Sequence, residues 1–229
     1  MKNRLLYLFI LSLMLWPNLS WADPTPPQMS TSDSQYLDTL NILIDHPGGL
    51  APFEQRGFLY YKYQLYQRAI TDFSSQVENN QSSTAYLYRA YCYEKLGKAQ
   101  LAKQDYQAVI NQSAKNHQEW NTHGLAHRNL KEYQAAVNDF QQALTIAPNH
   151  TGYLANLGEA YHLLKQYPQA IAHYTQALKI DPEYAYAYYL RGLTYYSRGQ
   201  YLAARADFVQ ACALGDSEGC DVLKPEAWE

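Results

Sequence analysis

The chain has 229 residues, of which 47% are hydrophobic and 17% are charged, and its formal net charge is -3. This composition is that of a folded chain and excludes a wholly disordered one. The mild negative charge argues against a surface that binds the phosphates of nucleic acid.

Residues 1–22 have the pattern of an export signal. Lys2 and Arg4 precede an apolar run from Leu5 to Trp16, and small residues fit cleavage after Ala22. The alternative is an uncleaved anchor, but the run is short against the roughly 20 apolar residues of a spanning helix. We therefore expect a mature chain in a bacterial periplasm or secreted beyond it, without stable membrane insertion.

A polar linker and a short helix are expected next. Residues 23–35 are rich in Pro, Ser, Thr and Gln, which is typical of a flexible linker. Ser34 is expected to cap a helix that runs to about Asp45 before His46–Gly49 breaks it. This N-terminal unit, at residues 36–49, would cover the first apolar face of the segment that follows.

From residue 50 onward the sequence repeats with a period of 34 residues, after a first unit of 33. Gly124 and Gly158 occupy the same place in neighbouring units, as do Pro148 and Pro182. A fixed period of this length indicates a repeat array rather than a helical bundle with accidental periodicity. The five expected units are 50–82, 83–116, 117–150, 151–184 and 185–218, followed by a C-terminal cap and tail at 219–229.

Each unit is expected to form two helices. In the fourth unit the first helix runs from about Thr151 to Leu164, with apolar residues at three- and four-residue spacing. Lys165 and Gln166 turn the chain, and the second helix ends at Asp181 because a proline follows. Gly158 is expected where two helix backbones approach closely.

These features resemble the tetratricopeptide repeat (TPR) family. The fourth unit supplies the residues of that family's pattern at Leu154, Leu157, Gly158, Tyr161, Ala170, Tyr174, Ala177 and Pro182. The resemblance implies an all-α fold, a right-handed solenoid of helix pairs. It also implies that the first helices line a concave groove that binds other proteins.

The resemblance places the groove at fixed positions of the first helices. The candidates for contact with a partner are Phe58, Tyr61, Tyr91, Glu94, Asn121, Arg128, Glu159, His162, Tyr186, Tyr189 and Tyr196. Tyrosine suits such a surface because it offers broad contact at low entropic cost, together with a hydroxyl. The alternative for some of these tyrosines is packing behind the surface.

The run from Cys212 to Cys220 resembles the disulfide-stapled turns of secreted, cysteine-rich helical repeat proteins. A turn at Gly215 and a short helix would bring the two cysteines together, and an oxidising compartment permits the bond. The alternative is two free, partly buried thiols. Cys92 lies within a first helix and is interpreted as a small core residue.

No catalytic motif is apparent. His123 and His127 are four residues apart, but no third metal ligand accompanies them, so both are interpreted as structural. A repeated aspartate is expected to be solvated or to make local hydrogen bonds; it occurs as Asp72, Asp105, Asp139 and Asp207.

The sequence thus predicts a non-enzymatic scaffold without a cofactor, which binds a protein or an extended peptide in the cell envelope. One alternative is a protein that binds or hydrolyses cell-wall material, with Glu159 and His162 as its polar pair. Another is a secreted factor that acts on host proteins.

Overall fold

The computed structural model describes residues 28–44, 51–80 and 82–224. The predicted export signal, the first residues of the predicted linker, the predicted turn at 46–49 and the end of the C-terminal tail lie outside these ranges. In the described part every regular element is an α-helix. The helices are α2 (Thr31–Ile44), α3 (Ala51–Lys62), α4 (Tyr66–Asn80), α5 (Ser83–Lys95), α6 (Ala99–Ile110), α7 (His117–Asn129), α8 (Tyr133–Ile146), α9 (Thr151–Leu163), α10 (Tyr167–Ile180), α11 (Ala185–Ser197), α12 (Tyr201–Ala213) and α13 (Ser217–Asp221).

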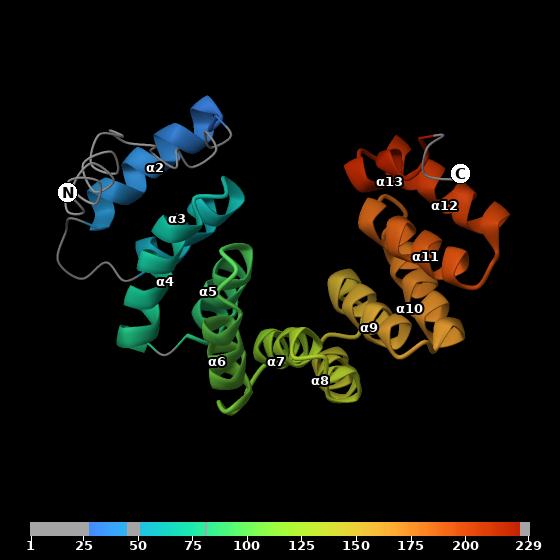
Figure 1. The fold of residues 1–229 in the computed structure, drawn as a ribbon, viewed down its shortest axis with the longest axis horizontal. Helices are drawn as coiled ribbons and strands as arrows, with labels where there is room; N and C mark the ends of the chain where they lie inside the picture. The colour runs from blue at the N-terminus through green and yellow to red at the C-terminus, as the bar shows by residue number, and fades with distance from the viewer. Residues whose placement is uncertain (1–27, 45–50, 81, 225–229) are drawn as a thin grey trace, which may run out of the picture.

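Helices α3 to α12 form five pairs that stack one after another into a helical solenoid (Figure 1). Each pair packs against the next through its second helix and the following first helix. First helices of successive pairs also touch each other, from α3 and α5 through to α9 and α11. The array therefore curves, and its two ends face each other across an open centre (Figure 1).

The turn inside each pair depends on one residue in the left-handed region. Gly97 and Gly199 hold φ at 71° and 74°, and Gln64, Lys131 and Lys165 hold it at 58°, 64° and 61°. This conformation closes the first helix with a backbone hydrogen bond that reaches back over its last turn. Glycine adopts it without strain, whereas the other three pay a steric cost.

Aromatic rings stack on small residues in the core of each pair. A Cβ atom added to Gly158 would lie 2.6 Å from the Tyr174 ring. The expected close approach is therefore that of a ring against a helix backbone, rather than of two backbones. Gly192 and Phe208 repeat this contact in the last pair, where the corresponding distance is 2.7 Å.

Three pairs carry a buried arginine–aspartate ion pair, which we call the clamp. In α5 and α6, Arg89 donates from Nε and Nη2 to the two carboxylate oxygens of Asp105, each at 2.8 Å. Its Nη1 donates to Ser74 Oγ of α4 at 3.0 Å. Its guanidinium lies over the rings of Tyr86 and Tyr93. One side chain therefore joins three consecutive helices.

The clamp recurs at both ends of the array. The equivalent sets are Arg56, Asp72 and Asn41, and Arg191, Asp207 and Thr175. The repeated aspartate is expected to be solvated or to make local hydrogen bonds, and this is wrong for the three clamps. Asp72, Asp105 and Asp207 are 1%, 5% and 6% exposed, and each pairs with an arginine of the other helix, 16 residues away. A buried carboxylate is costly unless it is paired, and the forked guanidinium pairs both oxygens at once.

Helix α2 covers the start of the array, but it begins earlier than expected. It starts at Thr31, because Ser30 Oγ accepts a hydrogen bond from the backbone N–H of Asp33 at 3.1 Å. Residues 31–35 are thus helical and not part of a linker. Leu40 of α2 is buried, and the helix packs on α3.

The predicted disulfide between Cys212 and Cys220 is present, with the two Cα atoms 4.6 Å apart. Gly215 turns the chain at a φ of 92°, and Asp216 caps α13 through the N–H of Gly219 at 2.6 Å. The short helix α13 packs on α12 at the end of the array. None of the helices in the described ranges is long and apolar enough to cross a membrane.

Candidate functional site

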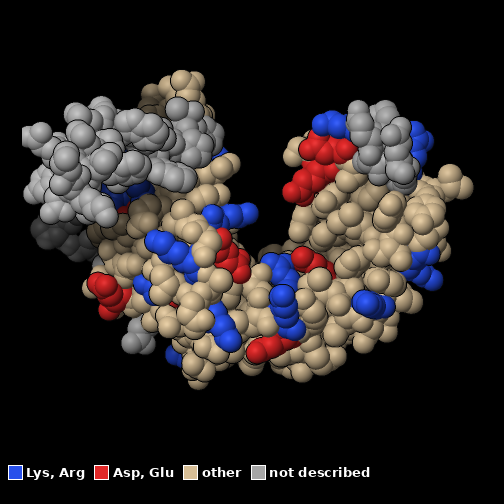
Figure 2. Space-filling view, in the orientation of Figure 1, with Lys and Arg blue, Asp and Glu red and all other residues tan. Residues whose placement is uncertain are grey.

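The first helices α3, α5, α7, α9 and α11 carry the candidate binding residues. In the space-filling view the curve of the array encloses a deep hollow whose walls carry both basic and acidic side chains (Figure 2). The contacts between successive first helices make this inner surface continuous. We describe its residues from the N-terminal end to the C-terminal end.

Aromatic rings form one cluster at the N-terminal end of the inner surface. Phe58 meets Tyr88 edge-on with ring centroids 4.6 Å apart, and Tyr61 meets the same ring at 5.5 Å. Tyr91 lies 5.5 Å from Tyr88 and 6.4 Å from Tyr61. Burial raises the pKa of Tyr91 to about 12. These rings are therefore neutral and half-buried, and their packing ties α3 to α5.

A charged pair lies in the middle of the inner surface. Arg128 of α7 donates from Nη1 to Glu159 of α9, and the two side chains are 19% and 23% exposed. The charge of Arg128 acts on the pKa of Tyr91, and the charges of both Glu159 and Arg128 act on the pKa of Tyr186, so the ion pair lies within electrostatic range of both tyrosines. Burial, with a further contribution from Glu159, raises the pKa of Tyr186 to about 12. Tyrosines of α5 and α11 thus lie near one ion pair between them.

Two polar contacts flank this ion pair and also join neighbouring first helices. Asn156 Nδ2 donates to Asn121 Oδ1 at 2.8 Å. His162 Nδ1 lies 2.9 Å from the hydroxyl oxygen of Thr194, and that hydroxyl donates to the carbonyl of Leu190. The hydroxyl proton is thus used, so His162 donates from Nδ1. Burial lowers the pKa of His162, which keeps the ring neutral near pH 7.

The remaining candidates are less closely grouped. Tyr186 and Tyr189 stack with centroids 6.4 Å apart, and Tyr189 also packs near Phe208 of α12. Tyr196 contacts Tyr201 at the far end of α11 and is 46% exposed. Glu94 is exposed at the end of α5. The structure therefore assembles a central row from Tyr91 to Tyr186, with Tyr196 and Glu94 outside it.

Sequence reasoning missed three residues of this surface. Tyr88, Asn156 and Thr194 contact the candidates, yet they fall outside the groove positions that the family pattern supplies. Asn156 lies 35 residues after Asn121, one more than the repeat period, so comparison of the two units could have suggested the contact.

His123 and His127 pack inside the third pair. His123 is 6% exposed and meets the Trp120 ring. His127 Nδ1 lies 2.6 Å from Glu132, while its Nε2 is 3.5 Å from Asp139, too far for a hydrogen bond. Burial raises the pKa of Asp139 to about 6. In the described part of the chain no three His, Cys, Asp or Glu side chains are grouped as metal ligands.

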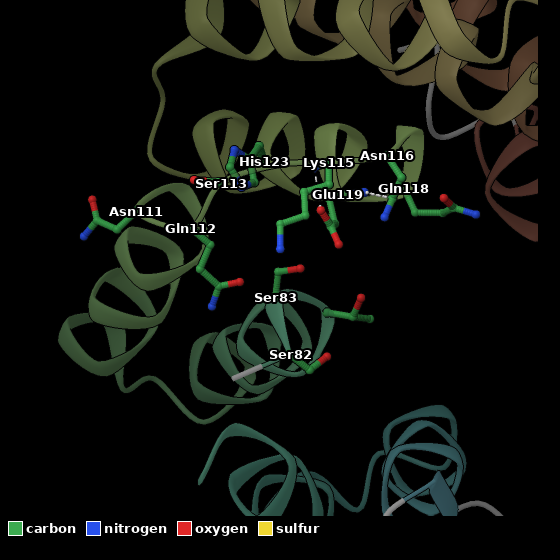
Figure 3. Close-up of a pocket in the computed structure, with 11 residues that line it drawn as sticks. Ser82, Ser83, Asn111, Gln112, Ser113, Lys115, Asn116, Gln118, Glu119 and His123 are labelled. Carbon is green, nitrogen blue, oxygen red and sulfur yellow. Dashed lines mark hydrogen bonds between the residues drawn. The ribbon is translucent and has the colours of Figure 1, made fainter. Parts of the chain in front are cut away.

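A polar cavity of about 870 Å³ separates the second pair from the third (Figure 3). It lies between the N-terminal ends of α5 and α7. Several of its polar groups are already engaged, since Asn116 Oδ1 accepts from the N–H of Glu119 at 2.9 Å. Glu119 Oε2 in turn accepts from the N–H of Lys115 at 2.6 Å, and Ser82 caps α5. We interpret this cavity as a gap that remains where the second pair meets the third.

Models of the tetratricopeptide repeat match residues 84–116, 118–150 and 185–214, and a further TPR model matches residues 158–197. Together these matches cover more than half of the chain. No curated protein matches it.

Several solved structures share the fold. A chain of the APC/C hetero-tetramer Cut9–Hcn1 is 22% identical with a TM-score of 0.68 over 86% of this chain, which spans 40% of that chain's length. A tetratricopeptide repeat protein from Parabacteroides merdae is 19% identical, with a TM-score of 0.67 over 86% of this chain and 78% of its own. PilF of Pseudomonas aeruginosa is 18% identical, with a TM-score of 0.56 over 80% of this chain and 78% of its own.

Proposed function

Because this chain belongs to the tetratricopeptide repeat family, and is thus a protein–protein interaction scaffold, we propose that it holds an extended segment of a protein partner on its inner surface. The observation that carries this proposal is the central row of Tyr91, Arg128, Glu159 and Tyr186. The row crosses four successive first helices, α5, α7, α9 and α11.

The chemistry of the row suits an extended peptide. Arg128 and Glu159 neutralise each other, so the surface offers donors and acceptors with little net charge. An extended peptide likewise exposes an N–H and a carbonyl at each residue. Tyrosines on either side supply flat, partly apolar contact area, and such residues commonly dominate binding energy.

The same contacts argue for a non-catalytic role. Glu159 is held by Arg128, and His162 donates from Nδ1 to Thr194. Neither side chain is directed at the other as an acid–base pair would be. The alternative of wall hydrolysis through these two residues is therefore less favoured.

We also propose that the chain works outside the cytoplasm, in the bacterial envelope. The disulfide between Cys212 and Cys220 supports this location, because such bonds persist in oxidising compartments. Cell fractionation and N-terminal sequencing test it. A periplasmic product that begins at Asp23 is expected, and a cytoplasmic product that begins at Met1 would contradict it.

Binding is tested by capture from an envelope extract, with the mature chain as bait. Tyr186→Ala removes an inner-surface ring that is 37% exposed. The matched control is Tyr201→Ala, which removes a ring of α12 that is 56% exposed. Loss of a binding hot spot weakens affinity about thirtyfold, so the bound partner should disappear with Tyr186→Ala alone. Equal capture by both variants would reject the inner surface as the binding site.

A further inference from the structure

The three clamps show that a guanidinium fits the space between the two helices of a pair and the helix that precedes the pair. In the last pair, the Arg191 guanidinium lies between Asp207 on the second helix and Thr175 on the preceding second helix. The ring of Tyr188 lies 5.5 Å from it. The space therefore accepts a planar group that donates hydrogen bonds and packs against a ring.

The fourth pair lacks this group. Leu157, His173 and Gln141 occur 34 residues before Arg191, Asp207 and Thr175, so they take the three clamp positions in α9, α10 and α8. Leucine is shorter than arginine and has no donor. The hydrogen-bond donors of the guanidinium thus have no counterpart here, although the His173 ring stacks on Tyr161 much as Arg191 lies over Tyr195. The surrounding helices keep their packing.

A cavity of about 370 Å³, wide open to solvent on one side, lies at this position. Leu157, His173 and Gln141 all line it, together with Leu144, Leu154 and Gln176. Its size falls within the range of small-ligand sites. The coincidence of the cavity with the substituted clamp indicates that the missing side chain leaves room for a group from outside.

We propose that this cavity binds the ring of a tyrosine or tryptophan side chain of a protein partner, with the ring O–H or N–H donated to the side-chain oxygen of Gln141. The site lies among α8, α9 and α10. It shares α9 with the inner surface, but its α9 residues are Leu154 and Leu157 rather than Glu159 and His162. It therefore does not depend on the peptide site proposed above.

The lining selects an uncharged ring. The clamp carboxylate is replaced by His173, and burial lowers the pKa of this histidine, which keeps it neutral. A cation such as an arginine side chain would find no carboxylate among the lining residues, so no ion pair would hold it there. Leu154, Leu157 and Leu144 instead offer apolar contact to a flat ring.

The acceptor follows from the position of Gln141. Ser74 and Thr175 accept a hydrogen bond from the clamp arginine at the equivalent place. Gln141 donates from Nε2 to Tyr161 at 3.1 Å, which directs the amide and leaves its oxygen as the acceptor. His173 stacks on Tyr161 at an angle of 4°, and its buried Nδ1 has no hydrogen-bond partner in the described structure. It adds a second polar atom at the wall of the cavity.

The test uses capped amino acids, which present one side chain each. N-acetyltyrosinamide should bind with a Kd of about 1 mM, seen as saturable shifts of the Leu154 and Leu157 methyl signals in NMR. N-acetylphenylalaninamide, which lacks the hydroxyl, should bind about fivefold more weakly. N-acetylargininamide should produce no saturable shift.

Three variants define the site. Leu157→Arg with His173→Asp rebuilds the clamp and should abolish binding, while the melting temperature is retained or raised. Gln141 is exposed, so Gln141→Ala leaves the core intact. This variant should lose only the preference for the tyrosine probe over the phenylalanine probe. Tyr201→Ala, which removes an exposed ring of α12 that belongs to neither site, should leave Kd unchanged.

Several outcomes would overturn the proposal. They are tighter binding of the arginine probe, absence of saturable shifts with the tyrosine probe, and unchanged binding by the folded clamp variant.

Discussion

Removal of one clamp arginine should destabilise the fold far more than removal of a surface charge. Arg89→Leu leaves the carboxylate of Asp105 without its guanidinium, and this side chain is only 7% exposed. Breaking a buried pair from one side costs about 3–5 kcal/mol. The hydrogen bond to Ser74 and the contacts with Tyr86 and Tyr93 are lost as well.

The fourth pair supplies the compensating change. Leu157 and His173 occupy the clamp positions there, so Arg89→Leu with Asp105→His copies a combination that this chain already uses. No charge is then left buried, and replacement of both members of a buried pair is often close to neutral. The double variant should lie within about 1.5 kcal/mol of the unmodified chain, which makes the coupling energy at least about 2 kcal/mol.

Urea unfolding followed by helical circular dichroism measures these free energies, with Asp105→His completing the cycle. Lys224→Ala is the control, because its ion pair with Asp221 is 64% and 66% exposed and should change stability by less than about 1 kcal/mol. If the double variant is as unstable as the sum of the two single variants, the clamp does not act as a unit and the reasoning fails.

Three further predictions concern single positions. Lys165→Gly should stabilise the fold by about 0.5–1 kcal/mol, because Lys165 has a φ of 61°; an equal gain from Lys179→Gly, within α10, would show that strain is not the cause. Asp139→Asn should stabilise the fold by about 2–3 kcal/mol at pH 7.5 but not at pH 4. The pKa of Asp139 is 3.8 in the unfolded chain and about 6 in the folded one, so ionisation of the carboxyl destabilises the fold as pH rises through this range. A gain in stability that does not depend on pH would contradict this reasoning. Reduction of the Cys212–Cys220 bond, which closes a loop of 8 residues, should destabilise the C-terminal cap by about 2.5 kcal/mol; alkylation of the unfolded, unreduced chain should label only Cys92, and three labels would exclude the bond.

The helices could be predicted from sequence because their signals are local. Periodic apolar residues and the proline after Asp181 predicted helices that the structure places at Thr151–Leu163 and Tyr167–Ile180. The predicted start of α2 is wrong, because Ser30 and Ser34 are both suitable caps and the structure uses Ser30. Ser30 and Asp33 also bond to the hydroxyl of Tyr63, a contact that lies 30 or more residues away in sequence.

The clamps could not be read from any single helix. A single aspartate on a polar helix face is usually solvated, so no one helix reveals the pairing. Its arginine lies 16 residues earlier on the other helix of the pair, and that spacing is the signal that was missed. The cavity beside Leu157 was even less visible, because it is defined by a side chain that this repeat does not have.

The distribution of clamps bears on how the inner surface should be tested. The clamps secure the first, second and last pairs, whereas α7 to α10 have none. In this middle part, the ion pair of Arg128 and Glu159 joins α7 to α9 on the inner side of the array. A substitution of Arg128 therefore perturbs both the proposed contact with a partner and the packing between two pairs. Tyr186 is partly exposed and belongs to the clamped last pair, so loss of binding by Tyr186→Ala, with unchanged melting, is the cleaner measure of the inner surface.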